Sequence, residues 1–219
     1  MKYKCLVLDH DDTVVDSTAT IHFPCFVEYL GKYRPNLKDN YDIDSYFRKN
    51  FDPGILSLLS DEVGLSKEEI EHEGEYWREY VKGHIPRAYD GIREIIDKYL
   101  TRGGTIAVVS HSYREYIERD YRANGLKMPT LVYGWELGAD KRKPAPYAIH
   151  DIMERLSIDA SEILVVDDLK PGYDMARAAG CDFAAAGWAY NVPEIEAFMR
   201  ANCDYYLPTV ESLSDLLFK

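Results

Sequence analysis

The chain has 219 residues, which suits one large domain or a core domain with a smaller insert. Its formal net charge of −12 disfavours a nucleic-acid partner, because non-specific affinity for a phosphate backbone comes from lysine and arginine. We find no signal-peptide pattern and no run near the roughly 18 apolar residues of a membrane span, so we expect no membrane partner. The four cysteines include no C-x-x-C pair, which favours free thiols and a cytoplasmic protein.

Short apolar segments alternate with helical patterns along most of the sequence. The clearest predicted strands span residues 3–8, 106–109 and 163–166, which are apolar as buried strands are. Strands that alternate with helices predict an α/β fold, with a Rossmann-like, mainly parallel sheet covered on both faces. In such sheets ligands bind beyond the carboxyl ends of the strands. Weaker strand candidates lie at residues 130–133, 182–186 and 204–207.

Several of the predicted core helices have recognisable starts. Asp90 is placed to cap the first of them. Ser112 and Glu115 have the spacing of a capping box, which predicts that the next helix begins there. Pro193 suits the first position of a later helix, because proline lacks only an N–H that would be unpaired at that position.

Residues 17–84 break the alternation, because they contain helical patterns but no strong strand. Ser66 and Glu69 form a capping-box pattern there, ahead of a helix with an apolar stripe. We therefore predict a catalytic core formed by residues 1–16 and 85–219, and a small helical cap formed by residues 17–84. Such an insert would act as a lid that excludes water, which favours small substrates over proteins.

The first predicted strand ends in the acidic sequence Asp9-His10-Asp11-Asp12-Thr13. Alternate residues at a strand end point the same way, so we expect Asp9 and Asp11 to converge on one site. Two carboxylates pressed together repel unless a cation lies between them, and Mg²⁺ prefers oxygen ligands. An acidic turn without any function would give the same pattern, so this motif needs support from elsewhere in the chain.

A hydroxyl and a lysine follow later in the chain. Ser110 comes directly after the predicted strand at residues 106–109, where its hydroxyl can donate to a phosphoryl oxygen. Lys143 stands directly before a proline-initiated helix and can act as a compact positive charge beside a phosphoryl group. Helix capping and an ordinary solvated lysine are the alternatives for these two residues.

The predicted strand at residues 163–166 leads directly into Asp167 and Asp168. Adjacent carboxylates after a fully apolar strand need a reason to coexist, and metal coordination provides one. Capping of the next helix is the alternative. Each of the four clusters is a modest signal, whereas their order along the chain is specific.

In this order the clusters resemble the motifs of the haloacid dehalogenase superfamily of phosphohydrolases, in its helical-cap branch of phosphoglycolate phosphatases and beta-phosphoglucomutases. The resemblance covers essentially the whole core, and for the cap it is architectural only. The matching residues are Asp9-x-Asp11-x-Thr13, Ser110, Lys143 in K-P-x-P, and the pair Asp167-Asp168.

Two positions depart from the pattern of that family. Asp12 stands where the family usually has glycine, which adds a carboxylate near the site and would alter the loop. His111 stands where asparagine is frequent, which would change how the phosphate or the substrate is held. Neither departure removes a catalytic group, so the chemistry of the family is still expected.

The resemblance implies a role for each matching residue. Asp9 is the nucleophile that forms an aspartyl-phosphate, and Asp11 protonates the leaving oxygen and then takes a proton from water. Mg²⁺ is held by Asp9, the backbone carbonyl of Asp11 and Asp168. Asp167 is a ligand or lies directly behind the ligands. The phosphate is bound by Ser110, His111 and Lys143.

The expected function is Mg²⁺-dependent hydrolysis of a phosphate monoester of a small molecule. Asp11 favours a phosphatase over the dehalogenases and phosphonate hydrolases that resemble this fold, because those enzymes lack an acid at that position. A phosphomutase would use the same residues and stays open. A phospho-receiver or a binding-only module is disfavoured, because receivers are about 120 residues long and every expected catalytic group is present here.

The identity of the substrate is left open among phosphoglycolate, a sugar phosphate and a nucleotide. Arg34, Arg48 and Lys49 of the insert are candidate anchors for a second anionic group on the substrate, although ordinary surface charge is the simpler explanation. The tyrosines of the insert either line a pocket or pack in its core, and the sequence does not indicate an oligomeric state. These tyrosines are Tyr29, Tyr33, Tyr41 and Tyr46.

Overall fold

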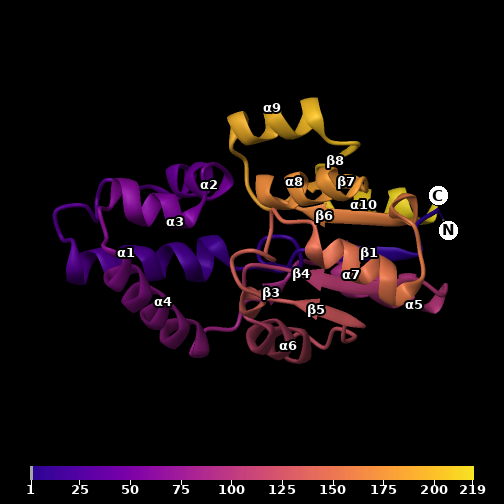
Figure 1. Ribbon diagram of the computed structural model, residues 1–219, viewed down its shortest axis with the longest axis horizontal. Helices are drawn as coiled ribbons and strands as arrows, with labels where there is room; N and C mark the ends of the chain where they lie inside the picture. The colour runs from indigo at the N-terminus through magenta and orange to yellow at the C-terminus, as the bar shows by residue number, and fades with distance from the viewer. Residues whose placement is uncertain (1) are drawn as a thin grey trace. The chain divides into compact units, whose positions relative to one another are not determined.

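The computed structural model describes residues 2–219 and separates the chain into two compact units, whose elements are labelled in Figure 1. One unit contains the residues up to Asp16 together with Arg87–Asn191 and Glu196–Lys219. The other unit contains Ser17–Pro86 and Val192–Ile195. The sites predicted at the strand ends all belong to the first unit.

The first unit is built on a six-stranded parallel sheet in the order β5-β4-β1-β6-β7-β8. Its central strand is buried on both faces, which explains why its sequence is a continuous apolar run. The predicted fold class and all six predicted strands are confirmed. The strands are β1 Cys5–Leu8, β4 Thr105–Val109, β5 Leu131–Tyr133, β6 Ile163–Asp167, β7 Asp182–Ala186 and β8 Tyr205–Leu207.

The register of the central strands brings their carboxyl ends to one level. Leu8 lies opposite Val108 on one side and Val166 on the other. Asp9, the next residue along β1, is therefore level with the ends of both neighbouring strands, β4 and β6. This parallel register is what allows residues far apart in the sequence to meet at one edge of the sheet.

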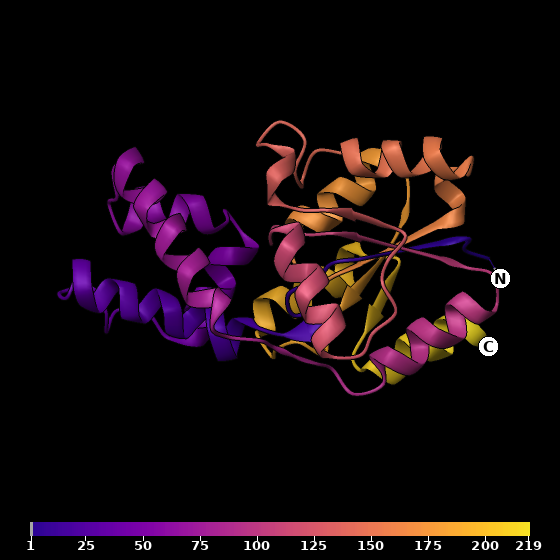
Figure 2. The ribbon, with the colours of Figure 1, turned by 90° about the horizontal axis from the view of Figure 1, so that it is seen from below.

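Helices cover both faces of this sheet. Figure 2 shows α7 and α8 on one side of the strands and α5 and α10 on the other. The connections also contain the short 3-10 helices Trp135–Leu137 and Ala160–Glu162. The helices are α5 Ile92–Thr101, α6 Arg114–Ala123, α7 Tyr147–Leu156, α8 Lys170–Ala179, α9 Pro193–Asn202 and α10 Val210–Phe218.

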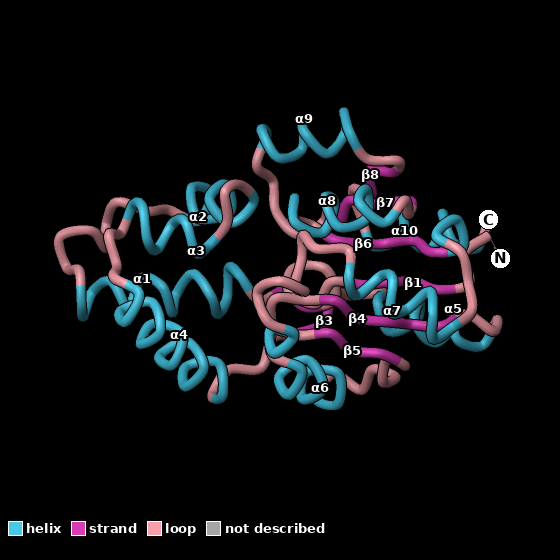
Figure 3. Tube along the Cα trace, in the orientation of Figure 1, coloured by secondary structure: helices cyan, strands magenta, loops and turns pink. Residues whose placement is uncertain are grey.

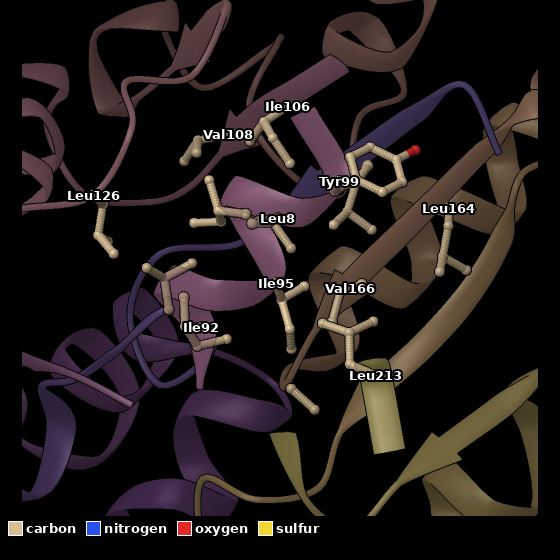
Figure 4. Close-up of a cluster of buried hydrophobic side chains, with 14 of the residues drawn as sticks. Leu8, Ile92, Ile95, Tyr99, Ile106, Val108, Leu126, Leu164, Val166 and Leu213 are labelled. Carbon is tan, nitrogen blue, oxygen red and sulfur yellow. The ribbon is translucent and has the colours of Figure 1, made fainter. Parts of the chain in front are cut away.

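A buried hydrophobic cluster joins the sheet to α5 and α10 (Figure 4). Ile95 and Tyr99 of α5 belong to this cluster together with Leu8, Val108 and Val166 of the three central strands. Side chains alternate between the faces of a strand, so the residues between these pack on the opposite face and the sheet has two buried sides. The resulting rigid core fixes the strand ends that carry the site.

The second unit is helical, and the part of the chain between residues 17 and 86 contains no strand (Figure 3). The predicted helical insert is confirmed, whereas its role as a lid stays a prediction. No helix among residues 2–219 is long and apolar enough to cross a membrane. The elements are the π-helical turns Thr18–His22 and Leu58–Glu62 and the helices α1 Phe23–Tyr33, α2 Ile43–Phe51, α3 Ile55–Ser57 and α4 Lys67–Lys82.

The tyrosines of the insert differ in their surroundings. Tyr29 and Tyr46 are buried within the hydrophobic core of the helical unit, and Tyr41 packs against that core. Tyr33 is exposed, and its ring is tilted by 39° against that of Tyr29, with the two centroids 4.7 Å apart. Packing therefore accounts for Tyr29, Tyr41 and Tyr46.

The predicted helix starts were right in two cases and wrong in two. The capping box of Ser66 is present, and α9 begins at Pro193. Asp90 does not cap α5, because the residue at that position is Gly91 in a left-handed conformation and Asp90 pairs with an exposed arginine instead. Ser112 does not cap α6, which begins later, at Arg114.

A pair of two-residue strands was not predicted. Strands β2 Val15–Asp16 and β3 Arg87–Ala88 pair antiparallel at the two points where the chain leaves and re-enters the first unit. Two residues are too few to produce a periodic pattern, so the sequence carries no signal for them.

Gly104 lies directly before β4 and has no room for a side chain. A Cβ atom there would meet the ring of Tyr99 at 2.3 Å, and Tyr99 is fully buried. We expect Gly104→Ala to lower the free energy of unfolding by about 1–3 kcal/mol, the usual cost of overpacking, as measured by urea denaturation. The control is Gly74→Ala in α4, where a Cβ meets nothing within 4 Å and alanine should stabilise the helix. Equal effects of the two substitutions would contradict this expectation.

Candidate active site

Lys143 joins the first and fourth motifs through two buried ion pairs. Its Nζ donates to Oδ1 of Asp9 at 2.8 Å and to Oδ2 of Asp167 at 2.7 Å. All three side chains are buried. Burial alone would lower the pKa of Lys143, but the two carboxylates raise it above its ordinary value. The lysine therefore stays positively charged, and the alternative of a solvated lysine is excluded.

Three buried carboxylates meet at the same edge of the sheet. Asp9, Asp167 and Asp168 each place an oxygen within 4.8 Å of the others. Burial raises the pKa of Asp167 to about 7, with Lys143 opposing the shift, and burial together with neighbouring carboxylates holds the pKa of Asp168 well above its ordinary value. One lysine does not neutralise three such groups. A set of carboxylate oxygens with excess negative charge fits Mg²⁺, so these residues suit the expected cofactor.

Gly172 in the first turn of α8 makes room for one of these carboxylates. A Cβ atom at this position would meet Oδ2 of Asp167 at 2.0 Å. The Asp167 side chain also accepts a hydrogen bond from the backbone N–H of Leu169 at 2.8 Å. The start of α8 thus fixes the orientation of Asp167.

Asp11 is held by a residue that sequence reasoning assigned to helix capping. The Ser112 hydroxyl donates to Oδ2 of Asp11 at 2.5 Å. The Ser112 backbone N–H donates to Oγ of Ser110 at 3.1 Å, so the loop after β4 reaches the first motif and also orients Ser110. Because a single serine has no distinctive spacing, the helix-capping pattern concealed this contact in the sequence.

Two residues of the loop after β7 donate hydrogen bonds to the backbone of the first and fourth motifs. Thr13 donates its hydroxyl proton to Oδ1 of Asp168 at 3.3 Å, which agrees with a structural role for Thr13. Trp188 donates from Nε1 to the Thr13 carbonyl at 3.2 Å, and Tyr190 donates its hydroxyl proton to the Asp168 carbonyl at 2.8 Å. Trp188 and Tyr190 belong to no motif and were missed by the sequence analysis.

His10 anchors the first motif to α6. Its Nε2 lies 3.1 Å from Oδ2 of Asp120, and both side chains are buried. The His10 ring also stacks on Tyr121 with centroids 5.9 Å apart. Sequence reasoning missed this pair. The available signal was Asp120 itself, an acid on the face of α6 that is otherwise buried and apolar, next to Ile117 and Tyr121.

The two departures from the family pattern have separate structural explanations. Asp12 has φ of 57°, in the left-handed region where glycine is favoured, which accounts for glycine at this position in the resembling proteins. Nε2 of His111 lies 3.0 Å from the carbonyl oxygen of Lys143. A carbonyl only accepts, so Nε2 must carry the proton. Burial and the charge of Lys143 lower the pKa of His111 to about 4, so the ring is neutral.

Comparison with known proteins agrees with this geometry. The model of the haloacid dehalogenase-like hydrolase family matches residues 6–186. The chain belongs to this family. It is 27% identical to a phosphoglycolate phosphatase of Vibrio parahaemolyticus, over 98% of this chain and 94% of that protein. It is 26% identical to a phosphoglycolate phosphatase of Nitrosospira multiformis, over 99% of this chain and 96% of that protein.

Solved structures support the same fold. A haloacid dehalogenase-like family hydrolase from Streptococcus pneumoniae superposes with a TM-score of 0.76 and covers 99% of both chains. Its sequence identity to this hydrolase is 18%, so the likeness concerns the fold alone.

The three cationic candidates of the helical unit each face an acidic side chain of that unit. The pairs are Arg34 with Glu69 at 2.6 Å, Lys49 with Glu62, and Arg48 with Glu194 at 3.6 Å. Arg48 has the longest of these ion pairs and is partly exposed. A role for these cations in anchoring the substrate stays a prediction.

Removing the positive charge of Lys143 should destabilise the fold, because it leaves two buried carboxylates unpaired. We expect Lys143→Met to lower the free energy of unfolding by about 3–5 kcal/mol in the absence of divalent ions, as measured by urea denaturation. Lys4→Met is the matched control, because Lys4 pairs with Glu162 at the surface and should contribute little. A loss in Lys143→Met no larger than in the control would show that the buried pairs do not support the fold.

The neutral state of His111 predicts a dependence of stability on pH. A base whose pKa is lower in the folded than in the unfolded chain binds its proton more readily when unfolded, so stability falls as pH drops from 6.5 towards 4. His111→Asn should therefore lose less stability than the wild type between pH 7 and pH 5. Unfolding free energies at both pH values test this expectation, and equal losses would refute it.

Proposed function

We propose that this hydrolase is a Mg²⁺-dependent phosphatase that cleaves the phosphate monoester of a small molecule through an aspartyl-phosphate on Asp9. The observation that carries the proposal is the environment of the Asp9 carboxylate. Its Oδ1 is bound by Lys143, while its Oδ2 accepts no hydrogen bond from residues 2–219. A carboxylate that is held at one oxygen and open at the other suits a nucleophile.

The reaction proceeds in two displacements at phosphorus. Oδ2 of Asp9 attacks the phosphorus, the bond to the ester oxygen breaks, and protonated Asp11 gives its proton to the leaving oxygen. Asp11 then takes a proton from a water molecule, whose oxygen attacks the phosphorus of the aspartyl-phosphate. The bond between phosphorus and Asp9 breaks, and inorganic phosphate is released with Asp9 restored.

The neighbouring side chains have supporting roles in both steps. The Ser112 hydroxyl donates to Oδ2 of Asp11 and so orients the carboxyl group that would exchange the proton. Lys143 holds Oδ1 of Asp9 and, with the Ser110 hydroxyl, stabilises charge on the phosphoryl oxygens. His111 contributes by binding the backbone carbonyl of Lys143.

The carboxylates of Asp9 and Asp168 and the backbone carbonyl of Asp11 would hold Mg²⁺, with Asp167 as a further ligand or directly behind the ligands. The ion, when bound, offsets the negative charge of the phosphoryl group and of the attacking carboxylate. Removal of divalent ions should therefore abolish turnover.

The full-length relatives named phosphoglycolate phosphatase make 2-phosphoglycolate the first substrate to test. The test is release of inorganic phosphate from a panel of monoesters that includes 2-phosphoglycolate, sugar phosphates and nucleotides, with Mg²⁺ and with excess chelator. The panel also addresses the phosphomutase alternative, because a mutase would move the phosphoryl group without releasing phosphate.

The nucleophile is tested by replacing it within the same panel. We expect Asp9→Asn to lose at least about 10³-fold in kcat while its unfolding curve stays cooperative, because an amide does not attack phosphorus. Asp90→Asn, which changes an exposed carboxylate, is the matched control and should keep full activity. Appreciable turnover by Asp9→Asn, or full wild-type activity in excess chelator, would overturn the proposal.

A further inference from the structure

Arg142 has no acidic partner among residues 2–219, in a chain with more acids than bases. Its guanidinium lies over the indole of Trp135, with Cζ 3.3 Å from the ring centroid. Its Nη1 is buried without a hydrogen-bond partner, and the side chain forms no ion pair with residues 2–219. By contrast, Arg155 and Arg177 of the same unit pair with Asp151 and Asp204. A buried donor left unpaired is unfavourable, so an external acceptor is expected.

The position of Arg142 ties it to the phosphate-binding end of the sheet. It directly precedes Lys143, so the two α-carbons are about 3.8 Å apart. Trp135 follows β5, and His111 follows the adjacent strand β4. His111 contacts Trp135 and Lys143. Its ring meets that of Trp135 edge-on with centroids 5.9 Å apart, and its Nε2 donates to the Lys143 carbonyl. The guanidinium and the catalytic lysine are thus held by one connected group of side chains.

The chemistry of this arrangement suits a carboxylate. Arginine presents a planar fork of donors that matches the two oxygens of a carboxylate. Stacking on Trp135 restricts the guanidinium in advance, which reduces the entropy lost on binding. The neighbouring ring of His111 is neutral, so it neither repels the guanidinium nor competes for the anion.

We propose that Arg142, held on Trp135, binds a carboxylate of the substrate and so selects phosphate monoesters of small hydroxy acids over esters of neutral alcohols. This inference rests on the proposed phosphatase function and adds a specificity residue to it. It also explains why histidine stands at position 111, where the family frequently has asparagine, because this ring supports Trp135 as well as Lys143.

The test compares two substrates that differ only at the group Arg142 would bind. These are 2-phosphoglycolate and 2-hydroxyethyl phosphate, in which a hydroxymethyl group replaces the carboxylate. We expect Arg142→Gln to raise KM for 2-phosphoglycolate about tenfold or more, to change KM for 2-hydroxyethyl phosphate less than about twofold, and to leave kcat nearly unchanged. Arg142→Lys should restore part of the loss.

Lys141→Gln is the matched control, because it removes a neighbouring positive charge that lies over Tyr147. A similar rise in KM for 2-phosphoglycolate in this control would mean that general electrostatics, and not Arg142, favours the anion. An equal effect of Arg142→Gln on both substrates, or no effect on either, would overturn the inference while leaving the phosphatase function intact.

Binding to the Asp9→Asn variant separates the two proposals if turnover is absent. Calorimetric titration with 2-phosphoglycolate should show weaker binding when Arg142→Gln is added to that variant, with 2-hydroxyethyl phosphate unaffected. Such a result without turnover by the wild type would overturn the phosphatase and retain the carboxylate site. Absence of binding by either compound would overturn both.

Discussion

The structure depends on a buried excess of negative charge at the carboxyl edge of one parallel sheet. Asp9, Asp167 and Asp168 converge there, and Lys143 is the cation that binds two of them directly. Such an arrangement is costly without a compensating ion, because burial and mutual repulsion oppose the ionised carboxylates. The strands beneath are apolar and fully buried, so the sheet holds these groups in place although they repel one another.

The surrounding contacts restrain the catalytic loops one by one. His10 joins the loop after β1 to Asp120 on α6, and Ser112 joins Asp11 to the loop after β4. Tyr190 binds the backbone at Asp168. Each contact lies behind or beside a proposed reacting group, so the rigidity that catalysis requires comes from single polar bonds between neighbouring loops.

The sequence predicted the sheet and the meeting of the motif residues at one edge of it, because both follow from regular patterns. Buried parallel strands are apolar throughout, and the polar residues that follow them must lie at one edge. Contacts such as Asp120 with His10, or Trp188 with Thr13, join single residues from separate loops and leave no periodic trace. A local pattern gave a wrong prediction where a residue has a partner distant in the sequence. Ser112 was predicted to cap α6, but its hydroxyl binds Asp11 instead.

The positions that differ from the family pattern are informative about function. Asp12 adopts a left-handed backbone that a non-glycine residue rarely takes, and it is buried close enough to Asp168 to raise the pKa of that carboxyl. His111 links Lys143 to Trp135 and so to Arg142. The carboxylate of Asp12 adds negative charge that a bound cation would offset. His111 supports the side chains that we propose bind an anionic group of the substrate.

The most direct test of the central claim is the melting temperature of the purified protein as Mg²⁺ replaces chelator, for the wild type and for Asp168→Asn. If the buried carboxylates require a cation, Mg²⁺ will raise the melting temperature of the wild type. Asp168→Asn will melt higher than the wild type in chelator, because one repelling charge is gone, and will respond little to Mg²⁺. A wild-type melting temperature that is indifferent to Mg²⁺, or an Asp168→Asn variant that keeps the full response, would contradict the account.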